Sequence, residues 1–219
     1  MSETYRRHDL VQVNVSAWGA WLGTRHDLDG VRHLDRWAQE GRPLIVRRRM
    51  PGETGETVPL GLPMPPSDGK RRIGLALPAA ALTPMAALNL AEASDYAPTA
   101  WRPAIAALLS LGCDHGIVPR PFGSLLWQAV TGLTYLNATS DLDLLWPCPD
   151  PVPINLLTGL EAIAENAAMR IDGEILLPDG TGLHWRELRD APEDGSVLAK
   201  GLEGVTLRSV AGLRDPVIA

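Results

Sequence analysis

The spacing of apolar residues in the second half of the chain predicts alternating strands and helices. Apolar residues from Leu156 to Ala167 recur with helical spacing, which predicts a core-facing crossover helix over 154–168. The apolar run that ends at Trp146 and the segment 169–177 each have the length and composition of a strand, and Pro178-Asp179-Gly180 predicts a turn into a further strand at 183–185. A strand, a helix and a strand in this order predict an α/β sandwich with the first two strands central.

The first third of the chain shows short apolar runs separated by turns. These runs predict strands at 8–13, 42–49 and 73–77. The segment 59–66 predicts a loop, because its repeated prolines withdraw donors from a strand ladder. A short mixed pattern at 31–38 predicts a helix that ends at Gly41.

The composition shifts toward Ala, Leu and Pro at 77–87, which indicates a boundary. Beyond it, 83–111 predicts two packing helices, one with Pro84 in its first turn and one that begins at Pro103. The expected fold class is therefore α/β (α+β), with a small, mostly-β domain at 1–80 followed by an α/β domain at 81–219.

The composition is that of an ordinary globular protein, with 45% hydrophobic and 21% charged residues among 219. No run approaches the ~18 apolar residues of a membrane helix. The polar start is not followed by an apolar segment, so we expect no secretory signal and a cytoplasmic location. Cys113 and Cys148 lie far apart without metal-ligand spacing, which predicts two reduced thiols.

The net charge of −6 is unevenly distributed, since basic residues outnumber acidic ones up to residue 78 and acidic residues dominate the remainder. Two basic clusters, Arg47–Arg49 and Lys70–Arg72, lie at the ends of predicted strands. Such clusters suit phosphates or an acidic protein partner, and they equally suit solvated charges at strand ends. Neither a nucleic-acid partner nor a membrane is expected.

Two carboxylates lie inside the apolar run that ends at Trp146. Asp141 and Asp143 are two residues apart, so on a strand they project from one face with Cα atoms roughly 6.5–7 Å apart. Both side chains can then converge on a hard cation such as Mg²⁺, which one or two carboxylates commonly hold together with bound phosphate. The alternative is a strand end with two solvated acids.

An anion-binding helix start is predicted upstream of these carboxylates. Gly123 and Ser124 open a short apolar segment that reads as a helix, with Ser124 as its N-cap. Free backbone donors at a helix N-terminus attract anions. Arg120 adds positive charge there, unless it is an ordinary surface arginine. Together with the carboxylates, these residues predict a magnesium-dependent triphosphate site.

This helix start followed by an Asp-Leu-Asp strand resembles the signature of the nucleotidyltransferase superfamily. One departure from the general pattern is the long separation between Ser124 and Asp141. The wider wording resembles one family more specifically, the malonate decarboxylase holo-[acyl-carrier-protein] synthases, which are phosphoribosyl-dephospho-CoA transferases. The segments that carry this resemblance are FGSLLWQ at 122–128, TGL at 131–133, SDLDLL at 140–145 and IDGEI at 171–175.

The resemblance implies a nucleotidyltransferase-like catalytic domain with a mixed sheet and Mg²⁺ as cofactor. It implies that triphosphoribosyl-dephospho-CoA is the donor, that a serine of the malonate decarboxylase acyl carrier protein is the acceptor, and that pyrophosphate leaves. Asp141 and Asp143 would then be metal-binding and catalytic, and Gly123, Ser124 and Arg120 would bind the donor phosphates.

The resemblance also implies a third catalytic acid on a neighbouring strand. Asp172 and Glu174 share a strand face, and Gly173 between them permits a close backbone approach. We favour Asp172 and keep Glu174 as the alternative; a solvent-facing pair is equally open.

Two other functions stay open on the sequence alone. One is a magnesium-dependent nucleotidyltransferase that uses an ordinary nucleoside triphosphate and another acceptor. The other is a non-enzymatic adaptor that docks an acidic protein through the two basic clusters.

Overall fold

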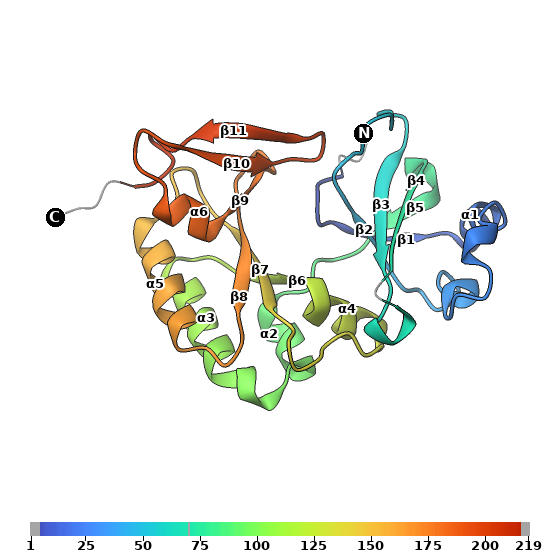
Figure 1. The fold of residues 1–219 in the computed structure, drawn as a ribbon, viewed down its shortest axis with the longest axis horizontal. Coiled ribbons are helices and arrows are strands. Elements are labelled where there is room, and N and C mark those ends of the chain that lie inside the picture. Colours follow the sequence, from blue (N-terminus) through green and yellow to red (C-terminus); the bar gives the residue numbers. More distant parts are fainter. Residues whose placement is uncertain (1–4, 70, 216–219) are drawn as a thin grey trace. The chain divides into compact units, whose positions relative to one another are not determined.

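The computed structural model describes residues 5–69 and 71–215, which form two compact units (Figure 1). The first unit contains the chain up to Ala87 together with Val130–Tyr135. The second unit contains Leu88–Ala129 and the chain from Leu136 onward.

The first unit is built on a five-stranded sheet in which every neighbouring pair is antiparallel. The strands follow the order β4-β3-β2-β1-β5. Their bounds are β1 Leu10–Val13, β2 Leu44–Val46, β3 Val58–Pro63, β4 Arg72–Leu77 and β5 Leu82–Pro84. Helix α1, Val15–Leu22, begins where the side chain of Asn14 accepts a hydrogen bond from the amide of Ala17.

Three expectations for this region are wrong. Residues 59–66 were expected to be a loop, but β3 pairs along its length with β4, and its prolines are accommodated in the ladder. The helix expected around Pro84 is instead β5, because these residues complete the sheet edge beside β1. The helix expected at 31–38 is only a 3₁₀ turn at Leu34–Arg36, which His33 precedes in the left-handed conformation.

The second unit contains a six-stranded mixed sheet in the order β11-β10-β9-β8-β7-β6. Only β7 and β8 are parallel, and the helix that connects them, α5, was predicted as the crossover. The strands are β6 Arg120–Phe122, β7 Leu142–Pro147, β8 Ile171–Leu176, β9 Gly182–His184, β10 Ser196–Lys200 and β11 Val205–Ser209. The helices are α2 Leu90–Ala93, α3 Arg102–Asp114, α4 Gly123–Thr131, α5 Ile154–Glu165 and α6 Trp185–Asp190. Mixed α/β content with one antiparallel and one mixed sheet confirms the predicted fold class.

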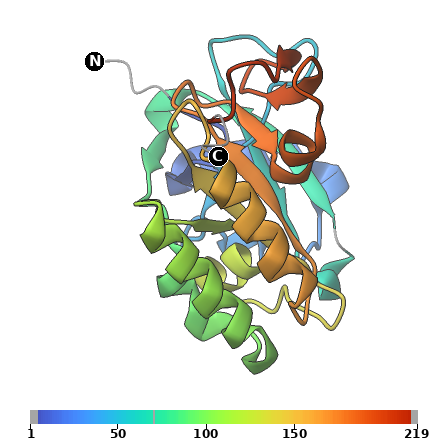
Figure 2. The ribbon, with the colours of Figure 1, turned by 90° about the vertical axis from the view of Figure 1, so that its left-hand side faces the viewer.

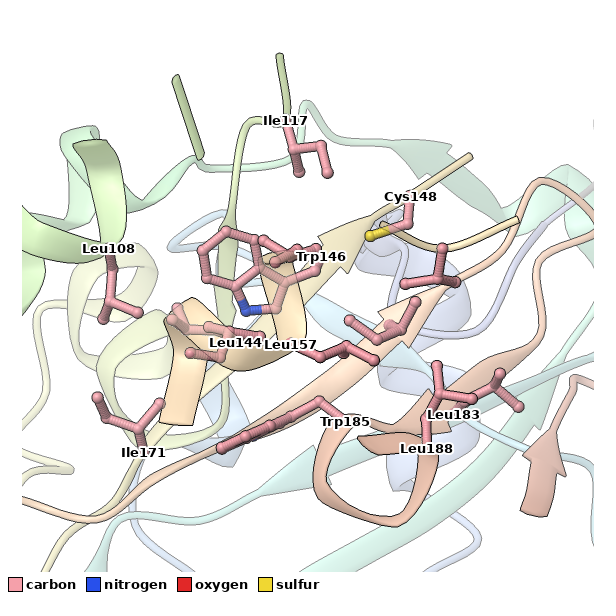
Figure 3. Close-up of a cluster of buried hydrophobic side chains, with 14 of the residues drawn as sticks. Leu108, Ile117, Leu144, Trp146, Cys148, Leu157, Ile171, Leu183, Trp185 and Leu188 are labelled. Atoms are coloured by element: carbon pink, nitrogen blue, oxygen red, sulfur yellow. The ribbon is translucent and has the colours of Figure 1, made fainter. Parts of the chain in front are cut away.

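Helices α3 and α5 lie side by side against the mixed sheet (Figure 2). Between them and the strands lies a cluster of buried apolar side chains, in which Trp146 of β7 and Trp185 of α6 are fully buried (Figure 3). Leu108 of α3 and Leu157 of α5 have no exposed surface in this cluster. Burial of each such side chain stabilises the fold by about 1.5–3 kcal/mol, so this layer fixes the positions of β7 and β8.

Cys148 is part of the same core and Cys113 is exposed, and both are free thiols. Burial raises the pKa of the Cys148 thiol to about 12, so this group is an inert apolar side chain at neutral pH. No helix in the described ranges has both the length and the apolar character needed to cross a membrane.

The long separation between Ser124 and Asp141 has a structural explanation. Val130–Tyr135, which begins with the last two residues of α4, belongs to the first unit, where the hydroxyl of Tyr135 donates a hydrogen bond to the carbonyl of Pro63. The chain therefore leaves the second unit and returns to it before β7 begins.

Candidate active site

One face of the six-stranded sheet packs in the core and the other carries polar groups. Leu142, Leu144 and Ile171 all belong to the buried cluster. Side chains alternate along a strand, so Asp143 and Asp172 point to the opposite face. The two aspartates are direct partners in the parallel register of β7 and β8, and neighbouring strands are ~4.8 Å apart. The sheet thus brings together two of the three predicted carboxylates.

The carboxylate of Asp143 lies against the first residue of α4. Phe122 is the register partner of Asp143 in the β6–β7 pair, so α4 begins directly beside this carboxylate. A Cβ atom at Gly123 would lie 2.0 Å from Oδ2 of Asp143, and Gly123 has a φ of +66°, in the left-handed region. Glycine meets both the steric and the conformational requirement. The residue predicted to approach the donor phosphates therefore also makes room for a predicted metal ligand.

Ser124 and Arg120 flank this junction. Ser124 is half-buried and is the second residue of α4, two positions beyond the N-cap and not the N-cap itself as predicted. Arg120 is half-buried on β6, two residues before Phe122, and therefore projects on the same sheet face as Asp143. A helix N-terminus and a guanidinium on the Asp143 face form a surface suited to phosphate.

Asp141 is half-buried and immediately precedes β7. No group of three or more His, Cys, Asp and Glu side chains within residues 5–69 and 71–215 is arranged to hold a metal ion. Mg²⁺ is usually held by one or two carboxylates, with phosphate and water oxygens as its other ligands. Asp141 and Asp143 provide two carboxylates, and the helix start beside Asp143 is suited to phosphate. These residues therefore fit a metal ion that binds together with a phosphorylated substrate.

Asp172 is fixed by three donors. Its Oδ1 is 2.8 Å from Nε2 of His184 and accepts the amide N–H of Gly173 at 2.8 Å, and its Oδ2 accepts from Arg170 at 3.0 Å. The hydrogen bond from His184 is the main reason that the pKa of Asp172 falls to about 2. Asp172 is therefore a fixed anion at neutral pH.

Glu174 occupies a different environment on the same strand face. Its side chain is buried, and Oε1 lies 3.3 Å from Nζ of Lys200. Its register partner on β7 is Leu145, whereas Asp172 pairs with Asp143. Gly173 between them needs its small size, because a Cβ there would lie 2.2 Å from the carbonyl oxygen of Leu144. The geometry thus favours Asp172 as the acid nearer to Asp143.

His184 and Lys200 were not anticipated from the sequence. A tight turn centred on Asp179 makes Glu174 and His184 register partners across β8 and β9. The turn predicted at 178–180 could therefore have indicated that His184 lies beside β8. For Lys200 the sequence offers no such signal, because β10 joins the sheet through its own pairing with β9.

The basic cluster at 47–49 is engaged in internal contacts. The guanidinium of Arg47 pairs with Glu53 and donates to the carbonyls of Leu60 and Leu75, and Arg49 donates to carbonyls of the following loop. The strand predicted at 42–49 in fact ends at Val46. Of the second cluster, Lys70 lies outside the described residues, and Arg72 begins β4 with an exposed side chain.

Two family models match the chain. Residues 6–87 match the phosphoribosyl-dephospho-CoA transferase MdcG N-terminal domain, and residues 87–211 match the corresponding C-terminal domain. The chain belongs to the phosphoribosyl-dephospho-CoA transferase family. This match confirms the family that the sequence motifs resemble, and the chain is an enzyme of the transferase class.

Curated members of this family are similar over most of their length. The phosphoribosyl-dephospho-CoA transferase of Bradyrhizobium diazoefficiens is 39% identical over 92% of this chain and 88% of its own. Those of Xanthomonas euvesicatoria pv. vesicatoria and Xanthomonas campestris pv. campestris are 41% and 40% identical, over 70% and 80% of this chain and 73% and 82% of their own. No solved structure matched this chain.

Proposed function

We propose that this transferase moves phosphoribosyl-dephospho-CoA from its triphosphoribosyl derivative onto a serine of the malonate decarboxylase acyl carrier protein and releases pyrophosphate. The observation that carries the proposal is the junction of β6, α4 and β7. There the carboxylate of Asp143 lies against Gly123 at a helix N-terminus, beside Asp172 on the next strand. Anion-binding and cation-binding groups at one point suit a metal-bound triphosphate.

In the proposed reaction the serine oxygen attacks the phosphorus nearest the ribose. A new P–O bond forms to the serine, and the bond from that phosphorus to the pyrophosphate oxygen breaks. We infer that the amides at the start of α4 and the guanidinium of Arg120 bind the departing pyrophosphate, because α4 begins beside Asp143 and Arg120 lies on the same sheet face as Asp143.

Asp172 aligns the attacking hydroxyl by accepting its hydrogen bond. A carboxylate with a pKa of about 2 is a weak base at neutral pH, so orientation is its main contribution. Phosphoryl transfer proceeds through a loose transition state in which positioning and charge stabilisation supply most of the catalysis. The serine proton is then lost to water as the new bond forms.

Asp141 and Asp143 are the residues that would hold Mg²⁺. When bound, the ion supplies positive charge that offsets the charge developing on the phosphate oxygens. These two carboxylates also repel an uncomplexed triphosphate, so donor binding should require the ion.

The direct test is to incubate the purified enzyme with apo carrier protein and the donor, and to weigh the carrier by mass spectrometry. We expect the carrier to gain the mass of one phosphoribosyl-dephospho-CoA group and pyrophosphate to be released in equal amount. Omitting the metal by adding EDTA, or replacing the acceptor serine by alanine, should abolish the gain. Transfer of a nucleotide from ATP or another ordinary triphosphate instead would identify a general nucleotidyltransferase and reject the proposed donor.

A further inference from the structure

The imidazole of His184 has a different partner on each of its two nitrogens. Nε2 is 2.8 Å from Oδ1 of Asp172, while Nδ1 accepts the backbone N–H of Glu187 at 3.4 Å and thereby caps α6. A backbone amide can only donate, so Nδ1 carries no proton in this arrangement. Neutral imidazole then carries its proton on Nε2, and His184 donates it to Asp172.

We propose that His184 is a positioning residue for the transfer reaction, which holds the Asp172 carboxylate in the orientation that the acceptor hydroxyl requires. This inference rests on the proposed function, because the orientation of Asp172 affects turnover only if Asp172 faces the reacting groups.

Rigidity distinguishes His184 from the other side chain that contacts Asp172. The side chains of His184 and Asp172 are 21% and 25% exposed, whereas that of Arg170 is 62% exposed. His184 is also the last residue of β9 and the N-cap of α6, so backbone on both sides restrains it. A long exposed arginine loses more side-chain freedom on binding and is a weaker clamp. His184 is therefore the contact able to fix the carboxylate.

The two tasks of His184 can be separated by two substitutions. Asparagine at position 184 is a good N-cap, but its side chain is too short to reach Asp172. The amide nitrogen of glutamine extends about as far from Cβ as Nε2 of histidine does, so His184→Gln retains a donor to Asp172 and loses the cap. Stability should therefore follow the cap and turnover should follow the bond to Asp172.

The test compares the full-length enzyme with His184→Asn and His184→Gln, using apo carrier and donor as substrates. Loss of a group that orients an active-site ligand typically costs 10–100-fold in activity, so kcat of His184→Asn should fall by about that factor. Its KM values should stay within about twofold, because a misaligned nucleophile impairs the chemical step rather than binding. His184→Gln should keep kcat within about threefold of the parent and should have a lower unfolding midpoint than His184→Asn.

Equal losses of kcat in the two variants, or activity that follows the unfolding midpoint, would overturn the positioning role. Asp172→Asn separates this failure from failure of the proposed site. If Asp172→Asn is inactive while His184→Asn is fully active, the site stands and the inference is wrong. If Asp172→Asn itself turns over normally, the role assigned to Asp172 in the proposed reaction is wrong and the inference falls with it.

Discussion

The basic cluster of the first unit and the acidic pair of the second unit differ in what their side chains contact. In the first unit, Arg47 pairs with Glu53 and with backbone carbonyls, so its charge holds the loop after β2 in place. In the second unit, the carboxylate of Asp143 lies at a helix N-terminus, against a glycine that no larger residue can replace without a steric clash. The first arrangement stabilises the fold, and we propose that the second binds a ligand.

The arginines of the basic cluster differ in how well they could reach a protein partner. A docking role for the cluster requires guanidinium groups that reach a partner. Arg48 is exposed, while Arg47 and Arg49 are half-buried and donate to their own loop. Reversing the charge of Arg47 should therefore perturb the fold before it tests docking, and Arg48 is the cleaner position for that experiment.

The largest expected effect is in the acidic pair of the second unit. Asp141→Asn and Asp143→Asn each remove the charge of a proposed metal ligand without a change of size, so transfer should fall by at least about 10³-fold. The unfolding midpoint should stay close to that of the parent. Asp114→Asn, at the exposed end of α3, is the matched control and should transfer normally. Parent-like turnover by either variant would remove that aspartate from the site.

Gly123→Ala should impair transfer less than the loss of the Asp143 charge does. The new Cβ would lie 2.0 Å from Oδ2 of Asp143 and would be held at a φ of +66°, so the carboxylate must move. We expect turnover to fall by about 10²-fold, as misplacement by about 1 Å can produce. Gly116→Ala is the control, because Gly116 has a φ of +64° with nothing within 4 Å of the added atom. An equally large loss of activity in both variants would show that backbone strain, and not displacement of Asp143, causes the loss.

Substitutions of Asp172 and of Glu174 should differ in their effects on turnover and on stability. Asp172→Asn should impair turnover as severely as Asp143→Asn, since it lies beside that residue in the register. Glu174→Gln should be milder in turnover and should lower stability by about 1–3 kcal/mol, because a buried charge partner of Lys200 is lost. Denaturant unfolding alongside kinetics measures both quantities. The reverse order of the kinetic effects would exchange the two roles.

The smallest effect is expected in the first unit, as a pH-dependent change of stability. Hydrogen bonding to Arg47 lowers the pKa of Glu53 from 4.5 to about 2. A lowered carboxyl pKa stabilises the fold above pH 4.5 and the contribution is lost as the pH falls toward 2. Glu53→Gln should therefore lower stability by about 1 kcal/mol at neutral pH, given the solvent screening of a partly exposed pair, and match the parent near pH 2. Glu56→Gln, exposed in the same loop, should show no such pH dependence.

Long elements with a clear apolar period were predictable. The helix at 154–165, the strand at 171–176 and the turn at Asp179 all follow local pattern, because the burial that drives them is continuous along the chain. The strands at 82–84 and 120–122 were not predicted, because three residues contain too little periodicity and their proline content suggests turns. They are strands because long-range pairing partners are available.

The residues of the candidate site could be proposed from the sequence, but the contacts between them could not. Asp143 was proposed from the spacing of two carboxylates and Gly123 from the helix start that it opens, but the contact between them depends on the register of β6 and β7. The bond between His184 and Asp172 depends on the hairpin of β8 and β9 together with the cap of α6. Register and capping are decided by tertiary packing, which a single sequence does not reveal.

We propose that Asp143 of β7, whose carboxylate lies against the start of α4, binds a metal ion together with the phosphates of the donor. Electron paramagnetic resonance can measure binding of Mn²⁺, as a substitute for Mg²⁺, to the parent and to Asp143→Asn with and without pyrophosphate. We predict that the parent protein together with pyrophosphate binds Mn²⁺ at least about tenfold more tightly than free pyrophosphate does. Asp143→Asn should lose this gain, because the remaining ligands do not complete the coordination shell. An equal gain in both proteins would show that Asp143 is not a ligand of the metal ion.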